Sequence, residues 1–242
     1  MSGRAVVWVM AFFFCSGNAM AGDPPLKPGR DPGGVAVAVL ADGFDYRLRD
    51  IADVVARDGE GVAIAWDSVD RDPLPFLADG KGTQAVRAAT ALGGVRVIAI
   101  RVDARDAASV GQGIAFAAST PARFVVADLS DNESAFGVAV AAAKKFTDVV
   151  FVASGAMDTV IPEAKDLANL VLVARSGSDV AAADAVARVL GCGHGELGGG
   201  DGAQRGSEFR ERLAQWESLA RQRGADAASC DHKRGPEAGQ QK

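Results

Sequence analysis

The chain has 242 residues, of which 48% are hydrophobic, enough for one compact domain with a sizeable core. Its 26 Lys and Arg residues face 31 Asp and Glu residues, so the net charge of −5 argues against a nucleic-acid partner. Histidine occurs only at His194, in a glycine run, and at His232, in a polar tail. Mechanisms that need a positioned imidazole, and metal sites with two histidines, are therefore disfavoured.

Residues 1–21 have the layout of a secretory signal peptide. Arg4 precedes an apolar run from Ala5 to Cys15, and the small-residue sequence Ala19-Met20-Ala21 follows it. The run is too short to anchor the chain in a bilayer, and the glycine and prolines at 22–25 would stop a helix there. We therefore expect export to the periplasm or the medium, with no stable membrane anchor after cleavage. The alternative is a buried N-terminal helix.

Two cysteines, Cys192 and Cys230, remain after removal of the signal peptide. In an oxidising compartment an even pair indicates one disulfide, which here would tie the C-terminal tail to the end of the core. The alternative is two buried thiols.

Between residues 34 and 190, six short apolar runs rich in β-formers alternate with helical stretches. Continuously apolar runs are typical of strands covered on both faces, and this alternation predicts a parallel sheet with right-handed crossovers. The fold class is therefore α/β, with three layers and helices on both faces of the sheet. The strands are expected at 35–40, 61–65, 95–100, 123–127, 149–154 and 170–174, and the helices at 47–57, 83–92, 107–118, 133–146 and 179–190.

The remaining segments have a different character. Residues 22–33 are expected to form a linker, as is the glycine-rich stretch 191–206. Ser207 is expected to cap an amphipathic helix over 207–224, in which Phe209, Leu213 and Trp216 form a narrow apolar stripe. We expect that stripe to pack on the domain, with docking on a partner as the alternative. Residues 225–242 are expected to form a disordered tail.

Motifs for nucleotide and metal binding fail when they are compared residue by residue. The sequence Gly80-Lys81-Gly82-Thr83 lacks the first glycine of a phosphate loop and its metal-binding hydroxyl. The turn after the first strand carries one glycine, too few for a dinucleotide fingerprint. The acidic residues at 128–133 lack the ligand spacing of a calcium loop. We predict neither a metal nor a cofactor.

The order of these segments resembles the subtilisin-like serine proteases (subtilases). The segment 37–51, VAVLADGFDYRLRDI, resembles the one around the catalytic Asp, and Lys81–Arg87 resembles the catalytic-His motif H-G-T-H-V-A-G. Further matches follow in the family's order over residues 34–190, and they imply a shortened subtilisin-like domain. These matches are VRVIAIRV (95–102), VGQGIAFAA (110–118), VVADLSDNES (125–134), VVFVASGAMD (149–158) and GSDVAAADAVARVL (177–190).

The resemblance places no catalytic triad in this chain. The Asp position holds Ala41, the His position Lys81 and the Ser position Asp179, while Met157 stands where the oxyanion-hole Asn belongs. A triad needs a nucleophile, an imidazole that takes its proton and a carboxylate that holds the imidazole. The resemblance therefore implies a pseudoprotease, and it explains the scarcity of histidine. It also implies that Lys81 and Asp179 lie close enough to form an ion pair.

Three hypotheses about function remain open. The first is a binding or scaffolding role with a protein or peptide partner, using the former peptide cleft. The resemblance assigns that cleft to Ser130, which Asp131 and Asn132 follow. The second is an active hydrolase in a shifted register, with a Ser178–Lys81 dyad and Asp42 near the Asp position. The third is an unrelated α/β module that binds a small molecule. The sequence does not assign an oligomeric state.

Overall fold

The computed structural model describes residues 22–127, 133–154, 161–174, 180–191, 197 and 200–223. Six parallel strands form one sheet in the order β2-β3-β1-β4-β5-β6, which confirms the predicted α/β class. The strands are β1 (Val35–Ala41), β2 (Ala65–Asp67), β3 (Val95–Arg101), β4 (Phe124–Ala127), β5 (Val150–Ser154) and β6 (Leu170–Val173).

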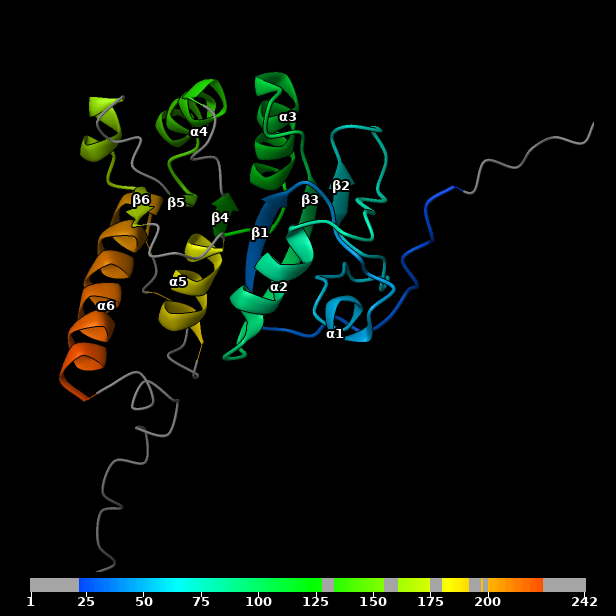
Figure 1. Cartoon of the computed structure of the whole chain (residues 1–242), viewed down its shortest axis with the longest axis horizontal. Helices are drawn as coiled ribbons and strands as arrows, with labels where there is room; N and C mark the ends of the chain where they lie inside the picture. Colours follow the sequence, from blue (N-terminus) through cyan, green and yellow to red (C-terminus); the bar gives the residue numbers. More distant parts are fainter. Residues whose placement is uncertain are drawn as a thin grey trace, which may run out of the picture.

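Helices cover both faces of the sheet, and the molecule has three layers (Figure 1). Helices α3 (Ala107–Ala118) and α4 (Glu133–Lys145) lie on one face. Helices α2 (Gly82–Thr90), α5 (Ala181–Leu190) and α6 (Gly202–Arg223) lie on the other. Two short helices complete the set, α1 (Arg49–Ala52) and the 3-10 helix η2 (Pro162–Asp166).

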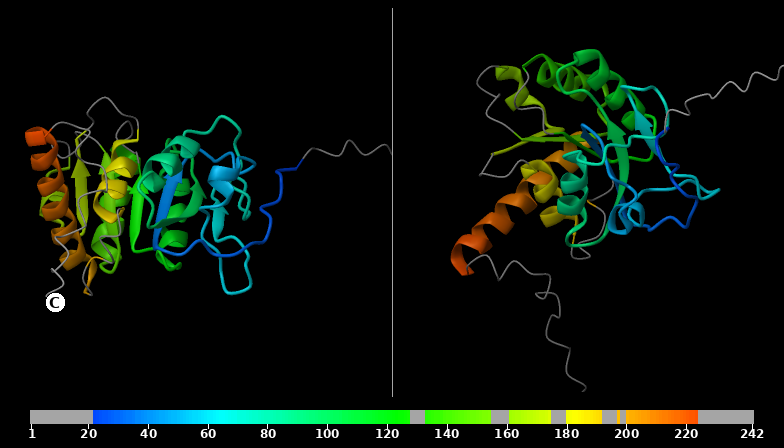
Figure 2. Two further views of the ribbon diagram at one scale, coloured as in Figure 1. Left: turned by 90° about the horizontal axis from the view of Figure 1, so that it is seen from below. Right: turned by 45° about the vertical axis from the view of Figure 1, so that its right-hand side comes forward.

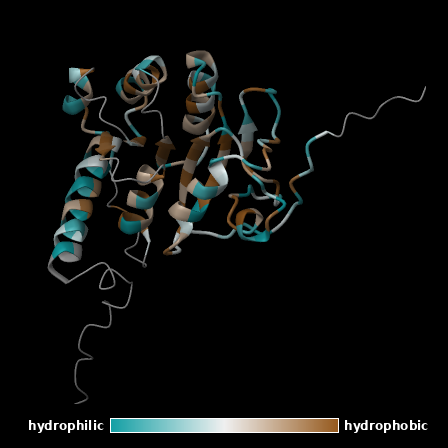
Figure 3. Ribbon diagram, in the orientation of Figure 1, coloured by the Kyte–Doolittle hydropathy of each residue, from teal (hydrophilic) through white to brown (hydrophobic). Residues whose placement is uncertain are grey.

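The two helical layers enclose two apolar cores. Along β1, Ala36, Ala38 and Leu40 face α3 and α4, while Val37 and Val39 face α2 and α5. This alternation follows from the pleat of a strand, which sends successive side chains to opposite faces. Coloured by hydropathy, most strands are apolar and β2 is paler, while α2, α5 and α6 carry hydrophilic residues (Figure 3).

The region before β2 differs from the sequence prediction. The helix expected over 47–57 ends at Ala52, because the chain beyond it pairs with the sheet: Ala56 N–H donates to the carbonyl of Val97 at 2.7 Å. The β-branched residues Val54 and Val55 favour such pairing over a helix. A turn at Asp58 then brings Arg57 opposite Ala63, so β2 begins only at Ala65.

Helix α6 begins at Gly202, five residues before the predicted start at Ser207. Glycine is required at two positions, because a Cβ on Gly202 would lie 2.2 Å from the carbonyl oxygen of Thr147 and one on Gly206 equally close to that of Ala168. With the helix this close, Phe209 is fully buried and its ring lies 5.7 Å from that of Phe124. The helix therefore packs on the domain, as expected from its apolar stripe.

The N-terminal segment 22–34, here called the strap, is bound to the domain rather than free as a linker would be. Asp31 holds it by accepting hydrogen bonds from the Arg57 N–H at 2.8 Å and from Arg96 Nη1 at 2.7 Å. Farther up the strap, Gly29 N–H donates to the carbonyl of Gly61. The strap runs along the outside of the region that contains α1 and β2 (Figure 2). Within the described ranges, no helix is both long and apolar enough to cross a membrane.

Ser68, just after β2, provides a test of packing in the core below α3. The residue is 5% exposed, and its Oγ has no hydrogen-bond partner among the residues that the structure describes. A buried hydroxyl without a partner destabilises the fold, so Ser68→Ala is expected to raise the free energy of unfolding by up to about 1 kcal/mol. Urea denaturation monitored by circular dichroism measures the change.

The matched control is Ser109→Ala, because Ser109 is equally buried but its Oγ accepts a hydrogen bond from the Asp103 N–H at 2.9 Å. Here the substitution removes a partner and is expected to lower the free energy of unfolding by about 1 kcal/mol. If Ser68→Ala destabilised the protein as much as the control does, the hydroxyl of Ser68 would have a bonding partner after all.

Candidate functional site

The candidate site lies at the carboxyl ends of β1 and β3, where ligands commonly bind in parallel α/β sheets. Strand β1 ends at Ala41, and the chain then turns through Gly43, whose φ of 140° disfavours any side chain. A second loop leads to Lys81, which immediately precedes α2. Ala41 is half-buried and Lys81 is exposed.

Hydrogen bonds join these two loops directly. The Lys81 N–H donates to Oδ1 of Asp42 at 2.7 Å, and the Asp45 N–H donates to Oγ1 of Thr83 at 2.9 Å. The carboxylate of Asp42 thus accepts from the first turn of α2, where free N–H groups and the helix dipole favour a negative charge. The segments that carry Ala41 and Lys81 are therefore held side by side.

Glycines make this close approach possible. A Cβ on Gly80 would lie 2.2 Å from the carbonyl oxygen of Gly43, and one on Gly82 would lie 2.5 Å from the same oxygen. The Gly82 Cβ would also meet the ring of Phe44 at 2.6 Å. Real Cβ atoms do not approach other atoms this closely, so both glycines are needed for the contact between the loops.

Arg101, the last residue of β3, connects the first loop to β2. Its Nε donates to the carbonyl of Asp42 at 3.1 Å, and its Nη1 donates at 2.8 Å to Oδ2 of both Asp67 and Asp70. Asp67 is fully buried, and its Oδ1 accepts from the N–H groups of Val69 and Asp70. The buried carboxylate is thus compensated by one guanidinium and two N–H groups.

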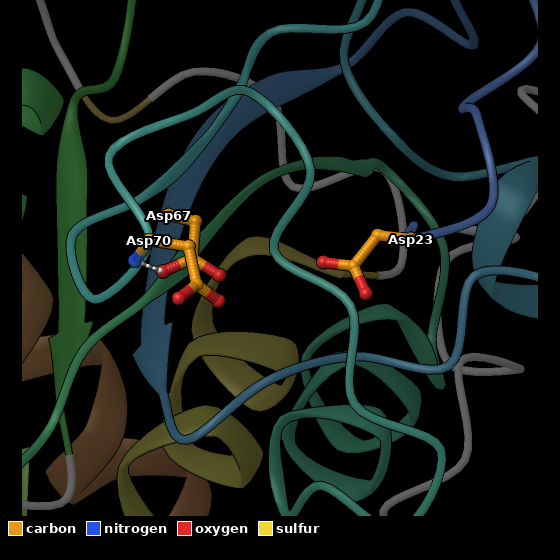
Figure 4. A group of neighbouring side chains, drawn as sticks. All are labelled: Asp23, Asp67 and Asp70. Atoms are coloured by element: carbon orange, nitrogen blue, oxygen red, sulfur yellow. Dashed lines mark hydrogen bonds between the residues drawn. The ribbon is translucent and has the colours of Figure 1, made fainter. Parts of the chain in front are cut away.

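A third carboxylate, that of Asp23 in the strap, points toward this pair (Figure 4). Carboxylate oxygens of Asp23, Asp67 and Asp70 all lie within 4.8 Å of one another. Because Arg101 already provides the cation for Asp67 and Asp70, we describe this group as a carboxylate cluster and assign no metal to it. The pKa of Asp23 is raised, first by burial and then by the charges of Asp72 and Asp70, against the opposing effect of Arg101.

On the other side of the first loop, Asp45 is buried and paired. Arg47 donates to its two carboxylate oxygens from Nε at 2.8 Å and Nη2 at 2.9 Å, and these bonds hold the pKa of Asp45 below its usual range. The Arg47 guanidinium also lies 4.8 Å from the centre of the Phe76 ring. This carboxylate therefore stays ionised and has a structural partner.

The structure thus brings together two of the positions assigned by the resemblance, Ala41 and Lys81. Among the described residues, no carboxylate forms an ion pair with the Lys81 ammonium. A methyl group and an exposed ammonium supply neither the imidazole nor the orienting carboxylate of a triad. A shift of the alignment by one residue would put Asp42 at the Asp position. In the structure its carboxylate accepts a hydrogen bond from the backbone N–H of Lys81.

The other predicted site residues lie outside the described ranges. They comprise the Ser-position and dyad residues, the oxyanion-position residue, the cleft candidates and both cysteines: Asp179, Ser178, Met157, Ser130, Asp131, Asn132, Cys192 and Cys230. The same holds for the signal peptide over 1–21 and the tail over 225–242.

Sequence reasoning missed the network around Arg101. Its partners Asp67 and Asp70 lie more than thirty positions away in the chain, as the separations of 34 and 31 show. The available signal was local: the run Asp67-Ser68-Val69-Asp70-Arg71-Asp72 places three acids directly after an expected strand. Acids at the carboxyl end of a buried strand need a counter-charge, and Arg101 ends the neighbouring strand.

Comparisons with known proteins give a distant likeness at the level of structure. No protein-family model matches the chain, and no curated protein matches it. Among solved structures, a cold adapted subtilisin-like serine proteinase is similar, with 18% sequence identity and a TM-score of 0.38. The likeness covers 53% of this chain and 48% of that one, so the chain spans about half the length of the solved structure.

Proposed function

We propose that this chain is an exported, catalytically inactive subtilisin-like domain that binds a protein or peptide partner. The observation that supports it most directly is the contact between the Asp42 carboxylate and the Lys81 N–H. This contact brings together the two segments that resemble the Asp-bearing and His-bearing segments of subtilases. In this chain those segments carry Ala41 and Lys81, which cannot activate a nucleophile as Asp and His do.

The proposed partner site is the segment that begins at Ser130, which the resemblance matches to the peptide-binding segment of subtilases. In a subtilase an extended peptide adds to this segment as a further strand, and backbone hydrogen bonds supply much of its affinity. Such binding does not need the triad. The acidic Asp131 beside Ser130 favours a partner with basic or neutral residues at this position.

Labelling by a fluorophosphonate tests catalytic inactivity. The purified protein is expected to show no covalent labelling and no cleavage of casein or of chromogenic peptides, because the sequence has Lys81 at the position of the subtilase histidine that takes the proton of the nucleophile. Ser178→Ala and Lys81→Met are the matched controls. Labelling of the unaltered chain that either substitution abolishes would overturn the proposal and favour the Ser178–Lys81 dyad.

Site-specific photo-crosslinking tests the binding role. A photo-reactive residue at Asn132 is expected to give a discrete adduct with an exported protein or peptide. The same residue at Glu60, an exposed position in a turn on the strap side of the molecule, is expected to give none. Equal adducts from both positions, or none from either, would contradict a partner site beside Ser130.

Independently, N-terminal sequencing of the exported chain is expected to begin at Gly22.

A further inference from the structure

The strap is fixed unequally along its length. Several hydrogen bonds hold its middle. The Gly29 N–H donates to the carbonyl of Gly61, and Arg57 Nη1 donates to the carbonyl of Lys27. The Asp31 carboxylate accepts from the Arg57 N–H and from Arg96. The head of the strap, residues 22–25, has one hydrogen bond to the domain among the described residues, from the Tyr46 hydroxyl to the carbonyl of Pro24 at 2.8 Å. The head is therefore the weakly held end.

The same head carries a charge that its surroundings oppose. Asp23 faces the Asp67 and Asp70 carboxylates within 4.8 Å, and the charge of Asp72 acts on it as well (Figure 4). Among the residues that the structure describes, Arg101 is the cation that acts on Asp23, and it already donates to both Asp67 and Asp70. An ionised Asp23 in this place is thus repelled by three carboxylates, whereas a protonated Asp23 is neutral and can donate a hydrogen bond.

We propose that the head of the strap is a proton-operated latch, docked on the domain while Asp23 is protonated and released when Asp23 ionises. The middle of the strap stays bound in both states, because its bonds do not involve Asp23. This inference is independent of the proposed function, since neither export nor a lost triad enters it.

The direction of the pH dependence follows from the raised pKa of Asp23. A carboxyl group whose pKa is higher in the docked state binds its proton more tightly there, so docking is most favourable below the ordinary pKa of 3.8. This contribution is lost as the pH rises through the raised value. The groups that face Asp23 are Asp67 from β2, Asp70 and Asp72 from the loop after it, Arg101 from β3 and Tyr46 from the first site loop. Burial and the negative charges of Asp23, Asp72 and Asp67 also raise the pKa of the Tyr46 hydroxyl, so it remains a donor throughout this range.

The latch adjoins the candidate site. Tyr46 follows Asp45, whose N–H bonds Thr83, and its ring packs edge-on against Phe76 at 5.4 Å. These contacts hold Tyr46 in place when the head leaves. Release would therefore expose the Tyr46 hydroxyl and open one flank of the loop that joins Ala41 to Asp45.

The single tyrosine of the chain makes the latch observable. In the purified full chain labelled with 13C-tyrosine, the ring resonance of Tyr46 is expected to shift in one step between pH 3 and pH 8, with a midpoint above 3.8. Asp23→Asn, which cannot ionise, is expected to abolish the step and keep the resonance at its acid position. Glu60→Gln, a charge-removing control away from the cluster, should leave the step unchanged.

Four results would overturn the latch. One is a Tyr46 resonance that does not shift with pH, and another is a step that persists in Asp23→Asn. The third is a step that coincides with loss of the amide resonances of β1, because the transition would then be global acid unfolding. The fourth is docking at neutral pH that requires stoichiometric Ca²⁺, with no pH step when Ca²⁺ is absent. In that case a metal ion, and not a proton, would hold the head on the domain.

Discussion

Replacing Arg101 by methionine is expected to lower the free energy of unfolding by about 3–5 kcal/mol, the range for breaking a buried ion pair by removal of one partner. Methionine keeps much of the apolar length of the side chain but leaves Asp67 fully buried without its cation. The substitution also removes the bond from Arg101 Nε to the carbonyl of Asp42, so the first site loop loses a tie to β3. Urea denaturation monitored by tryptophan fluorescence gives the magnitude.

Arg49→Met is the matched control for Arg101→Met. It removes the same kind of cation from an ion pair with Asp53, which lies four residues farther along the chain. The side chains of Arg49 and Asp53 are 93% and 64% exposed. Exposed pairs of this kind contribute about 0.5 kcal/mol or less. Similar losses of unfolding free energy in both variants would mean that Asp67 finds another partner when Arg101 is absent. The Arg101 network would then contribute little to stability.

The second large effect is expected at Gly82, where Gly82→Ala should lower the free energy of unfolding by about 2–3 kcal/mol. Gly82 is the first residue of α2, and alanine is the better helix former by about 1 kcal/mol. Without the tertiary contact the substitution would therefore stabilise the protein. The added methyl group instead meets the Gly43 carbonyl and the Phe44 ring. The sign of the change in the free energy of unfolding therefore shows whether the loops that carry Gly43 and Gly82 are in contact.

Gly59→Ala serves as the control for Gly82→Ala. An added Cβ at Gly59 meets no atom within 4 Å, so the substitution is expected to be neutral or to stabilise the protein by up to about 1 kcal/mol. Thermal unfolding by differential scanning calorimetry compares the two variants. A stabilising Gly82→Ala would show that the two loops do not meet, and it would remove the main support for placing Lys81 beside Ala41.

Much of the fold could be predicted because its signals are local. Apolar runs such as Val35–Leu40 and Val95–Ile100 read as buried strands, and the sheet contains them with nearly the predicted bounds. The prediction failed where a tertiary contact decides between two local preferences. Residues 54–56 carry a helical pattern but pair with Val97 of β3. Gly202 locally favours a loop, but its close contact with the carbonyl of Thr147 places it in α6.

The candidate site was predictable to a smaller extent. Matching segments in order placed Ala41 and Lys81 in neighbouring loops, and backbone hydrogen bonds join these loops in the structure. The charges around the site could not be predicted in the same way. The run Asp67–Asp72 after an expected strand signals only that a counter-charge is needed there. Among 26 Lys and Arg residues the sequence does not identify Arg101 as that charge, and it does not bring Asp23 to the cluster.

Helix α6 has a consequence for the order in which the molecule can assemble. Phe209 closes the core over Phe124, although it follows Phe124 by 85 positions in the chain. One face of the half-sheet formed by β4, β5 and β6 therefore lacks part of its cover until α6 is available. Packing over β4, β5 and β6 is therefore expected to be completed late in synthesis, once α6 has emerged.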